Sequence, residues 1–210
     1  MCLLLETIRF ENGQFQNLHL HQLRMDASLK ALFKNSEKID LEKALTKEIE
    51  FRQSGLSEEK PVPDKGLFKC RVIYNTQIKS MEWVPYGYPE IHSLKMVYSD
   101  EIEYYHKHEK RDVLNELYQK RGAADDILII KKGFITDTSF CNILFYNGKN
   151  WITPSFPLLN GTQRRYLLEK EQIVPAEITT SDLENFSKAR LVNAMIRFED
   201  ALDVDISNIF

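Results

Sequence analysis

Hydrophobic and polar positions in the first part of the chain alternate between strand-like and helix-like periods. The Asn12-Gly13 dipeptide is typical of a hairpin turn, so the apolar residues before it are expected to pair with those after it. Leucine and alanine then recur every three or four residues, which predicts helices. The expected elements, in order, are strands at 3–9 and 14–18, helices at 21–33 and 40–51, and strands at 67–74 and 78–84.

The second part of the chain is also predicted to mix helices and strands. Its elements are expected to be strands at 93–98, 126–131, 134–136, 142–145 and 151–153, helices at 111–120 and 162–170, a short helix from 181, and strands at 189–194 and 201–204. Ser181 and Glu184 have the spacing of a capping box, which predicts the start of the short helix. The fold class is therefore α/β (α+β).

A short segment rich in proline and glycine separates these two parts. Residues 85–89 contain two prolines and one glycine, a composition typical of linkers. We therefore expect a small N-terminal domain at 1–84, a linker at 85–92 and a larger C-terminal domain at 93–210.

Composition narrows the classes of function. The chain has 210 residues and a net charge of −3, so no basic surface indicates nucleic-acid binding. No apolar run approaches the length of a membrane span and the N-terminus lacks a signal-peptide pattern, which favours a cytoplasmic location away from membranes. Three cysteines without a Cys-x-x-Cys pair and five histidines without ligand spacing predict no metal site.

Lys107 lies in a charged run, residues 103–111, and is a candidate for binding an aldehyde cofactor. A lysine with that role must lose its proton, which requires a site that lowers its pKa. The commoner explanation for a lysine in a charged run is a solvated surface residue.

Asp137 follows a predicted strand within the sequence Ile-Thr-Asp-Thr-Ser. A carboxylate facing a protonated pyridine nitrogen would keep pyridoxal phosphate (PLP) an electron sink. The alternative is an aspartate that caps a turn through nearby backbone amides.

Gly161, Thr162 and Gln163 open a predicted helix. Free amides and the positive end of the helix dipole suit a phosphate there, although ordinary helix entry gives the same pattern. Arg24, on the first predicted helix, could bind the same phosphate or could be solvated.

In their joint order these segments resemble the PLP enzymes of fold type IV, the class IV aminotransferase family, over nearly the whole chain. The matching segments are Glu6-Thr7-Ile8-Arg9, Asn12-Gly13, Leu18, His21 and Arg24, Lys107 with Arg111, residues 135–145, Thr153-Pro154, residues 159–164 and residues 192–195.

The resemblance implies two α/β domains, like those of D-amino-acid and branched-chain aminotransferases, with PLP between them. It implies that Lys107 is the catalytic lysine and that the cofactor-binding residues are Arg24, Lys107, Asp137, Gly161, Thr162, Gln163, Asn193 and Ala194. A small-molecule amine substrate and a homodimer are implied as well. Arg71 and Arg111 are candidates for binding substrate carboxylates; Arg71 alternates with Cys70 and Val72, so it faces either the substrate or the solvent.

Three departures from the family pattern stand out. Asp137 occupies a position where most members have glutamate, and it is one methylene shorter. Gln163 occupies a position where threonine is usual, which removes a hydroxyl contact to the phosphate. The chain is also shorter than typical members.

The resemblance leaves three functions open. Asn193-Ala194-Met195 and Arg111 are more similar to 4-amino-4-deoxychorismate lyases, which make 4-aminobenzoate and pyruvate for folate synthesis. The main alternative is an aminotransferase for branched-chain or D-amino acids. A degenerate homologue that binds the cofactor, or only a partner, without turnover is the third.

Overall fold

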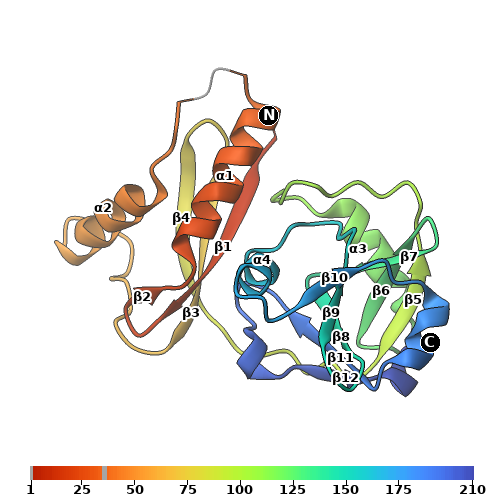
Figure 1. Ribbon diagram of the computed structural model, residues 1–210. Coiled ribbons are helices and arrows are strands. Elements are labelled where there is room, and N and C mark those ends of the chain that lie inside the picture. The colour runs from red at the N-terminus through yellow and green to blue at the C-terminus, as the bar shows by residue number, and fades with distance from the viewer. Residues whose placement is uncertain (1, 35–36) are drawn as a thin grey trace. The chain divides into compact units, whose positions relative to one another are not determined.

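The computed structural model describes residues 2–34 and 37–210 and divides the chain into two compact units (Figure 1). Unit 1 comprises the chain up to Gly87 together with His106–Glu109, and unit 2 comprises Tyr88–Tyr105 and Lys110–Phe210. The sequence analysis assigned Lys107 to the domain at 93–210. In the structure its segment is grouped with unit 1, because its backbone bonds to the first strand of that unit.

Unit 1 is an antiparallel sheet with two helices. Its strands lie in the order β2-β1-β3-β4, and the elements are β1 (Leu4–Glu11), β2 (Gln14–Phe15), α1 (Leu18–Leu32), α2 (Leu41–Gln53), β3 (Leu67–Tyr74) and β4 (Ile78–Pro85). Alternate residues of β1, among them Leu4 and Ile8, join Met25 and Leu29 of α1 and Leu45 of α2 in one apolar core. The helices therefore cover one face of the sheet.

The predicted partner of the first strand was wrong. Residues 4–9 pair with β3, from Leu4 opposite Tyr74 to Arg9 opposite Lys69, and only the end of β1 pairs with β2. Helix α1 already begins at Leu18, so the chain after the turn is too short to form a full strand. The second predicted hairpin, β3 with β4, is present.

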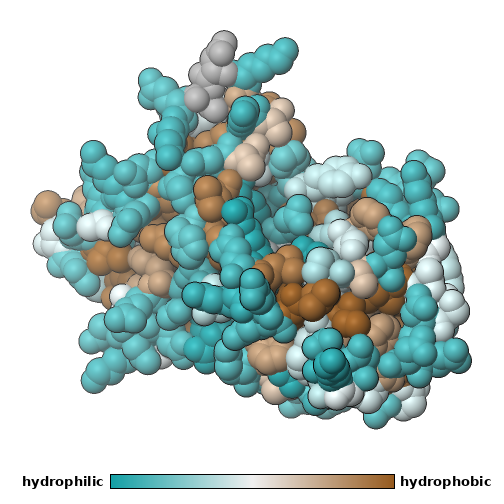
Figure 2. Space-filling view, viewed as in Figure 1, coloured by the Kyte–Doolittle hydropathy of each residue, from teal (hydrophilic) through white to brown (hydrophobic). Residues whose placement is uncertain are grey.

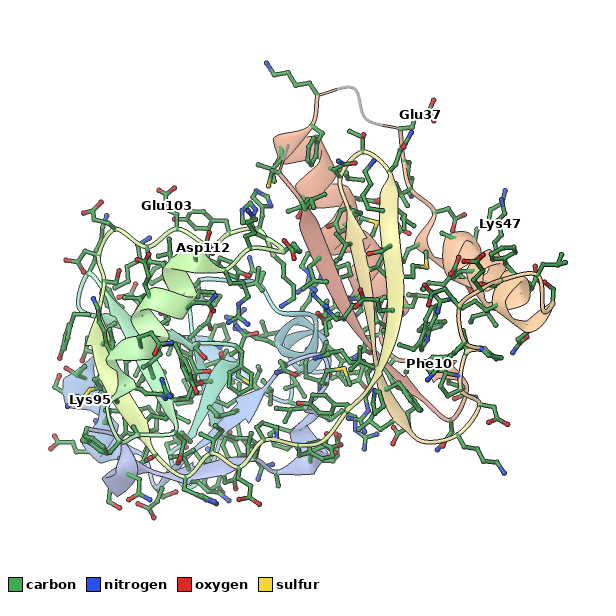
Figure 3. All side chains as sticks on the ribbon, turned by 180° about the vertical axis from the view of Figure 1, so that it is seen from behind. Phe10, Glu37, Lys47, Lys95, Glu103 and Asp112 are labelled. Carbon is green, nitrogen blue, oxygen red and sulfur yellow. The ribbon has the colours of Figure 1, made fainter. Side chains whose placement is uncertain are left out.

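Aromatic rings close one end of the unit 1 core. Phe10, labelled in Figure 3, lies 4.7 Å from Phe15 and 6.3 Å from Trp83 between ring centroids. The Arg52 guanidinium lies 5.0 Å from the Trp83 centroid. Lys47 of α2 projects away from the sheet, as the amphipathic pattern predicts.

Unit 2 is built on one large mixed sheet. The main strand order is β10-β9-β8-β7-β6-β5, and β11 pairs with both β8 and β12. The strands are β5 (Leu94–Tyr98), β6 (Asp126–Lys131), β7 (Phe134–Thr138), β8 (Asn142–Tyr146), β9 (Trp151–Pro154), β10 (Val174–Ala176), β11 (Lys188–Val192) and β12 (Asp203–Asp205). The helices are α3 (Asp112–Tyr118), α4 (Thr162–Glu169) and the 3₁₀ turns η1 (Gln119–Arg121), η2 (Thr180–Asn185), η3 (Phe198–Asp200) and η4 (Ile206–Asn208).

Two details of unit 2 differ from the predictions. Strand β10 was missed, because it is three residues long and contains a proline. The predicted capping box was placed two residues too late: Thr179, not Ser181, precedes the short helix, and its amide donates to Asp182 Oδ2 over 2.8 Å.

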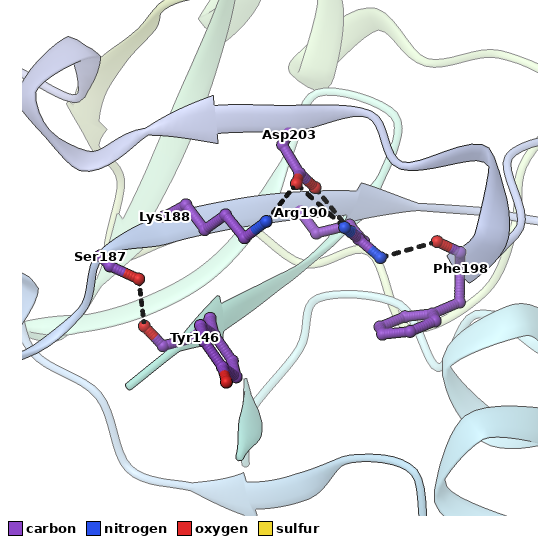
Figure 4. Close-up of polar contacts among 6 residues, drawn as sticks. All are labelled: Tyr146, Ser187, Lys188, Arg190, Phe198 and Asp203. Atoms are coloured by element: carbon purple, nitrogen blue, oxygen red, sulfur yellow. Dashed lines mark hydrogen bonds and ion pairs between the residues drawn. The ribbon is translucent and has the colours of Figure 1, made fainter. Parts of the chain in front are cut away.

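The last two strands of unit 2 are joined by an ion pair between Arg190 and Asp203 (Figure 4). Arg190 of β11 donates from Nε and Nη2 to Asp203 of β12, over 2.5 and 2.9 Å. Its guanidinium lies 4.6 Å from the centroids of both Trp151 and Phe198. These contacts hold β12 against β11 at the edge of the sheet.

Hydrophobic surface is visible on unit 2 near β10, where Val174 and Phe156 are among the exposed large hydrophobic side chains (Figure 2). Among the residues that the structure describes, no helix is both long and apolar enough to cross a membrane.

Candidate active site

Asp137 is a buried carboxylate of unit 2. It lies on β7 directly opposite Asn142 of β8 and is 5% exposed. Its Oδ1 accepts from Asn142 Nδ2 over 2.8 Å, and its Oδ2 accepts from the Leu159 amide over 2.9 Å. The carboxylate is therefore held by two separate segments of unit 2.

Burial sets the acidity of this group. It raises the pKa of Asp137 to about 6, and the opposing effects of the Leu159 amide, the Asn142 side chain and the charge of Arg164 do not cancel it. The ionised form of a buried carboxylate is destabilised unless a positive charge lies beside it. A protonated ring nitrogen carries such a charge.

The N-terminus of α4 packs directly against the same pair. Gly161 is the N-cap residue and has no side chain, and a Cβ atom there would lie 2.0 Å from Asn142 Oδ1. Only glycine therefore fits at this position. The helix presents the positive end of its dipole here, with Thr162 and Gln163 buried in its first turn.

Arg164 fastens α4 to the end of β9. Its Nε donates to Thr153 Oγ1 over 3.0 Å and its Nη2 donates to the Pro154 carbonyl over 2.8 Å. These two bonds explain the Thr-Pro and Arg positions of the sequence motif. They fix the orientation of α4, whose N-cap residue is Gly161.

A turn at residues 193–196 approaches the β7–β8 connection. Asn193 Oδ1 accepts from the amides of Met195 and Ile196 over 2.8 and 3.0 Å, and its Nδ2 lies 3.2 Å from Cys141 Sγ. Asn193 therefore shapes the turn that contains Ala194 and ties it to the strand connection next to Asn142.

Arg111 also contacts this connection. It precedes α3, and its Nη2 donates to the carbonyl of Ser139. The predicted contact of Arg111 with a substrate carboxylate stays a prediction, and the observed bond assigns the arginine a structural contact within unit 2.

In unit 1, a buried glutamate joins a histidine and an arginine. Glu6 of β1 is fully buried, and its Oε2 lies 2.6 Å from Nδ1 of His21. Arg24 donates to both carboxylate oxygens, from Nε over 3.0 Å and from Nη2 over 2.5 Å. This bidentate pair fixes the side chain of Arg24 on the first helix.

The charges within this cluster are strongly coupled. Burial alone would raise the pKa of Glu6, but Arg24 and His21 lower it to about 2, so the glutamate is ionised. Burial lowers the pKa of His21, and the charges of Arg24 and Lys107 lower it further against the opposing effect of Glu6. Lys107 is thus within electrostatic range of the cluster that holds Arg24.

The Lys107 segment forms a short bridge with the start of β1. The Leu5 amide donates to the Lys107 carbonyl over 2.9 Å, and the Glu109 amide donates to the Leu3 carbonyl over 3.0 Å. These bonds flank a bridge between Leu4 and His108. The His108 amide also donates to the His106 carbonyl over 3.0 Å, so the chain makes a tight turn with Lys107 at its centre.

Arg71 faces away from the helix-covered core of unit 1. It pairs with Thr7 on β1, and alternation places it on the face opposite the one that Ile8 presents to the core. Its Nη1 donates to Glu82 Oε2 over 3.0 Å. The predicted contact of Arg71 with a substrate stays a prediction.

Sequence reasoning missed four residues that shape the site. Asn142 and Arg164 lay inside quoted motifs but were not predicted as site residues, and Glu6 and His21 lay in the opening motif. The signal for Asn142 was its five-residue separation from Asp137, the spacing of two residues facing each other across a tight strand connection. Glu6 and His21 gave no comparable signal, because their contact depends on how α1 packs on β1.

Within the described ranges there is no group of three histidine, cysteine, aspartate or glutamate side chains that could hold a metal ion. The chemistry at this site must be judged from its lysine, its buried carboxylates and its arginines.

Comparison with known proteins decides the family. The profile of the class IV amino-transferases matches residues 3–198. The chain belongs to the class IV aminotransferase family. Members of this family are PLP-dependent enzymes, so the predictions of an enzyme, of PLP and of fold type IV are confirmed at the level of the family.

Three known proteins are similar to this chain. An uncharacterised protein of Haemophilus influenzae is 36% identical over 193 residues, covering 91% of this chain and 97% of its own. A solved structure from Haemophilus somnus, provisionally named a 4-amino-4-deoxychorismate lyase, is 35% identical with a TM-score of 0.83, covering 94% of this chain and 98% of its own. The branched-chain amino acid aminotransferase of Escherichia coli shares the fold, with 12% identity, a TM-score of 0.68, and 99% and 76% coverage.

Proposed function

We propose that this chain is a 4-amino-4-deoxychorismate lyase, which forms 4-aminobenzoate and pyruvate. The observation that carries the proposal is the match to the Haemophilus somnus protein of that provisional name, which extends over nearly all of both chains at 35% identity. A shorter match, 35% identical over 65 residues, is to a protein of Schizosaccharomyces pombe with the same provisional activity.

The residues present fit PLP. Asp137 is buried with its pKa raised to about 6, and the two hydrogen bonds it accepts, from Asn142 and from the Leu159 amide, come from neutral groups, so it suits a protonated ring nitrogen. The N-terminus of α4, with Gly161 as its N-cap residue and Thr162 and Gln163 in its first turn, suits a phosphate that binds backbone amides. Asp137 in place of glutamate is therefore consistent with retained cofactor binding.

The proposed donor set assigns Lys107 to the aldehyde carbon, Asp137 to the ring nitrogen and Arg24 to the phosphate. The other proposed phosphate-binding residues are Gly161, Thr162, Gln163, Asn193 and Ala194. Because Gln163 lacks the hydroxyl of the usual threonine, backbone amides and the helix dipole would supply more of the phosphate binding.

Bound PLP supplies an electron sink that makes the proton next to the substrate nitrogen acidic. Lys107 would be the general base that takes the C4 proton of the substrate ring. Its protonated form would then return a proton to the methylene carbon of the leaving enolpyruvyl group, which departs as pyruvate while the ring becomes aromatic. Asp137 would stabilise a positive charge on the ring nitrogen of the cofactor.

Arg71 is proposed to bind a carboxylate of the substrate. It lies on β3, and the Lys107 segment bonds to the other edge of β1, so two strand spacings of roughly 10 Å separate their backbones. A substrate with two carboxylates spans such a distance. Glu82, which pairs with Arg71 in the free protein, is half exposed and would yield to the ligand.

A pyruvate assay tests the proposal. Purified protein loaded with PLP is given 4-amino-4-deoxychorismate, and pyruvate is followed through lactate dehydrogenase with no keto acid added. Pyruvate release that is lost in Lys107→Ala supports the lyase. A visible absorption band that bleaches with an amino acid and recovers with a keto acid, without pyruvate release, would instead indicate an aminotransferase.

Failure to take up PLP at all would favour the degenerate homologue. If the lyase activity is present, the reaction supplies 4-aminobenzoate for folate synthesis. A homodimer, as is general in the family, is the proposed assembly, and sedimentation of the loaded protein measures it directly.

A further inference from the structure

The two histidines that flank Lys107 are both held by side chains of unit 1. Nδ1 of His106 lies 3.1 Å from Oγ of Ser28 on α1, and Nδ1 of His108 lies 3.0 Å from Sγ of Cys2. Each contact joins residues far apart in sequence. The segment is therefore anchored on both sides of the lysine.

A tight turn at Lys107 joins its two neighbours. The His108 amide donates to the His106 carbonyl over 3.0 Å, and His108 forms the bridge with Leu4 of β1. His106 contacts Ser28 of α1. The turn that contains Lys107 is therefore held to β1 at His108 and to α1 at His106.

The rest of the connection offers little regular structure to fix this turn. From the end of β5 at Tyr98 to the start of α3 at Asp112, the only bridge assigned among these residues, all of which the structure describes, is that of His108 with Leu4. A shift of the bridge by one residue would change the direction in which Lys107 projects. Side-chain anchors are what distinguish the two registers.

Of the two anchors, the one at Ser28 is the better protected. Ser28 is 3% exposed, whereas Cys2 is exposed. The Ser28 hydroxyl also hydrogen-bonds Tyr74 of β3, so it links the helix, the sheet and the lysine segment. A hydrogen bond in such a buried network contributes more to orientation than one in water.

We propose that His106 and Ser28 are positioning residues that hold in place the turn containing Lys107. This inference rests on the proposed role of Lys107 as the cofactor-binding lysine. Both residues act through the turn and not through contact with the cofactor. They affect the orientation of Lys107 and the rate at which its amine reacts with an aldehyde.

A set of matched variants separates positioning from packing. His106→Asn keeps a polar atom at the place of Nδ1, whereas His106→Gln moves it one bond outward, and Ser28→Ala removes the partner. His92→Asn, in an exposed loop of unit 2, is the control for loss of a histidine.

Two measurements are made on each variant. In the cofactor-free protein, hydrogen exchange is followed at the amides of Leu5 and Glu109, which bond the lysine segment to β1. In protein exposed to PLP, borohydride reduction fixes the cofactor on the lysine that holds it, and peptide mapping gives the site and the rate. Fluorescence of Trp83 during heating checks that unit 1 remains folded.

We expect His106→Gln and Ser28→Ala each to speed exchange and to slow labelling of Lys107 by about fivefold, the loss of one net hydrogen bond. The double variant should be no worse than either single variant, because both remove the same contact. His106→Asn and the control should match the wild type.

Labelling at Lys107 that is as fast in His106→Gln and Ser28→Ala as in the wild type would overturn the positioning role while leaving the proposed function intact. Cofactor fixed on a different lysine in the wild-type protein would refute the role of Lys107 itself. It would refute the positioning role with it, even if the exchange data showed the anchor to be present.

Discussion

Replacing Asp137 by asparagine is expected to stabilise the cofactor-free protein at neutral and alkaline pH. The carboxylate is buried, and its pKa rises from 3.8 to about 6 on folding. Because the folded-state pKa is the higher one, the contribution of Asp137 to stability is fully present below about pH 4 and is lost as the pH rises through about 6. Asparagine carries no charge and escapes this loss.

The magnitude follows from the shift. About two pKa units correspond to about 3 kcal/mol of stability lost above pH 6. Asparagine keeps one acceptor oxygen, so it loses one of the two bonds that Asp137 makes to Asn142 and Leu159, at about 1 kcal/mol. The variant should therefore be more stable than the wild type by about 2 kcal/mol near pH 8 and less stable by about 1 kcal/mol near pH 4.

Urea unfolding of the cofactor-free protein measures this difference. The chain has two tryptophans, with Trp83 in unit 1 and Trp151 in unit 2, so a Trp83→Phe background lets fluorescence report on unit 2. Asp64→Asn, on an exposed position of unit 1, is the matched control and should change neither stability nor its pH dependence.

The prediction is refuted if the free energies of unfolding of the wild type and of the Asp137→Asn variant change by the same amount between about pH 4 and pH 8. Saturating PLP gives a second check. A protonated ring nitrogen beside Asp137 would remove the decline in wild-type stability above about pH 6, and an unchanged decline would argue against that contact.

Three further changes test the site and the fold. Lys107→Ala should abolish the visible absorption of lysine-bound PLP without changing the far-ultraviolet circular dichroism, while Lys110→Ala, in the same charged run, should retain it. Gly161→Ala introduces a Cβ atom 2.0 Å from a neighbouring side-chain oxygen, so it should lower the stability of unit 2 by about 1–3 kcal/mol in thermal unfolding and weaken PLP binding in a cofactor titration. Gly87→Ala, at a position with open space around it, should change neither. Arg190→Ala removes a bidentate ion pair and two ring contacts and should destabilise unit 2 by about 1–3 kcal/mol in urea unfolding, and no change in that midpoint would show that the edge of the sheet is held otherwise.

Local sequence signals determined most elements of the fold. The periodicity of α1 and α2, the β3–β4 hairpin and the apolar run of β6 were all legible, because each depends on residues within a few positions of one another. The Asn12-Gly13 turn was also legible, but its consequence was not. Whether β1 pairs with the next residues or with β3 depends on how much of each partner is free to pair.

The motifs named the segments of the site, and the resemblance gave each a role. What the motifs could not supply was contact. That Asn142 holds Asp137, that Gly161 must lack a side chain because of Asn142, and that Glu6 clamps Arg24 are all consequences of strands and helices packing across long sequence separations.

Lys107 shows the division most clearly. The sequence by itself determined that this lysine lies in the motif of a PLP enzyme, because chemistry requires an amine at one place along the chain. Only the tertiary structure decided that its segment joins the edge of β1 through a tight turn between two histidines. The physical reason is that backbone hydrogen bonds between distant segments fix which way alternate side chains project, and no local pattern encodes that pairing.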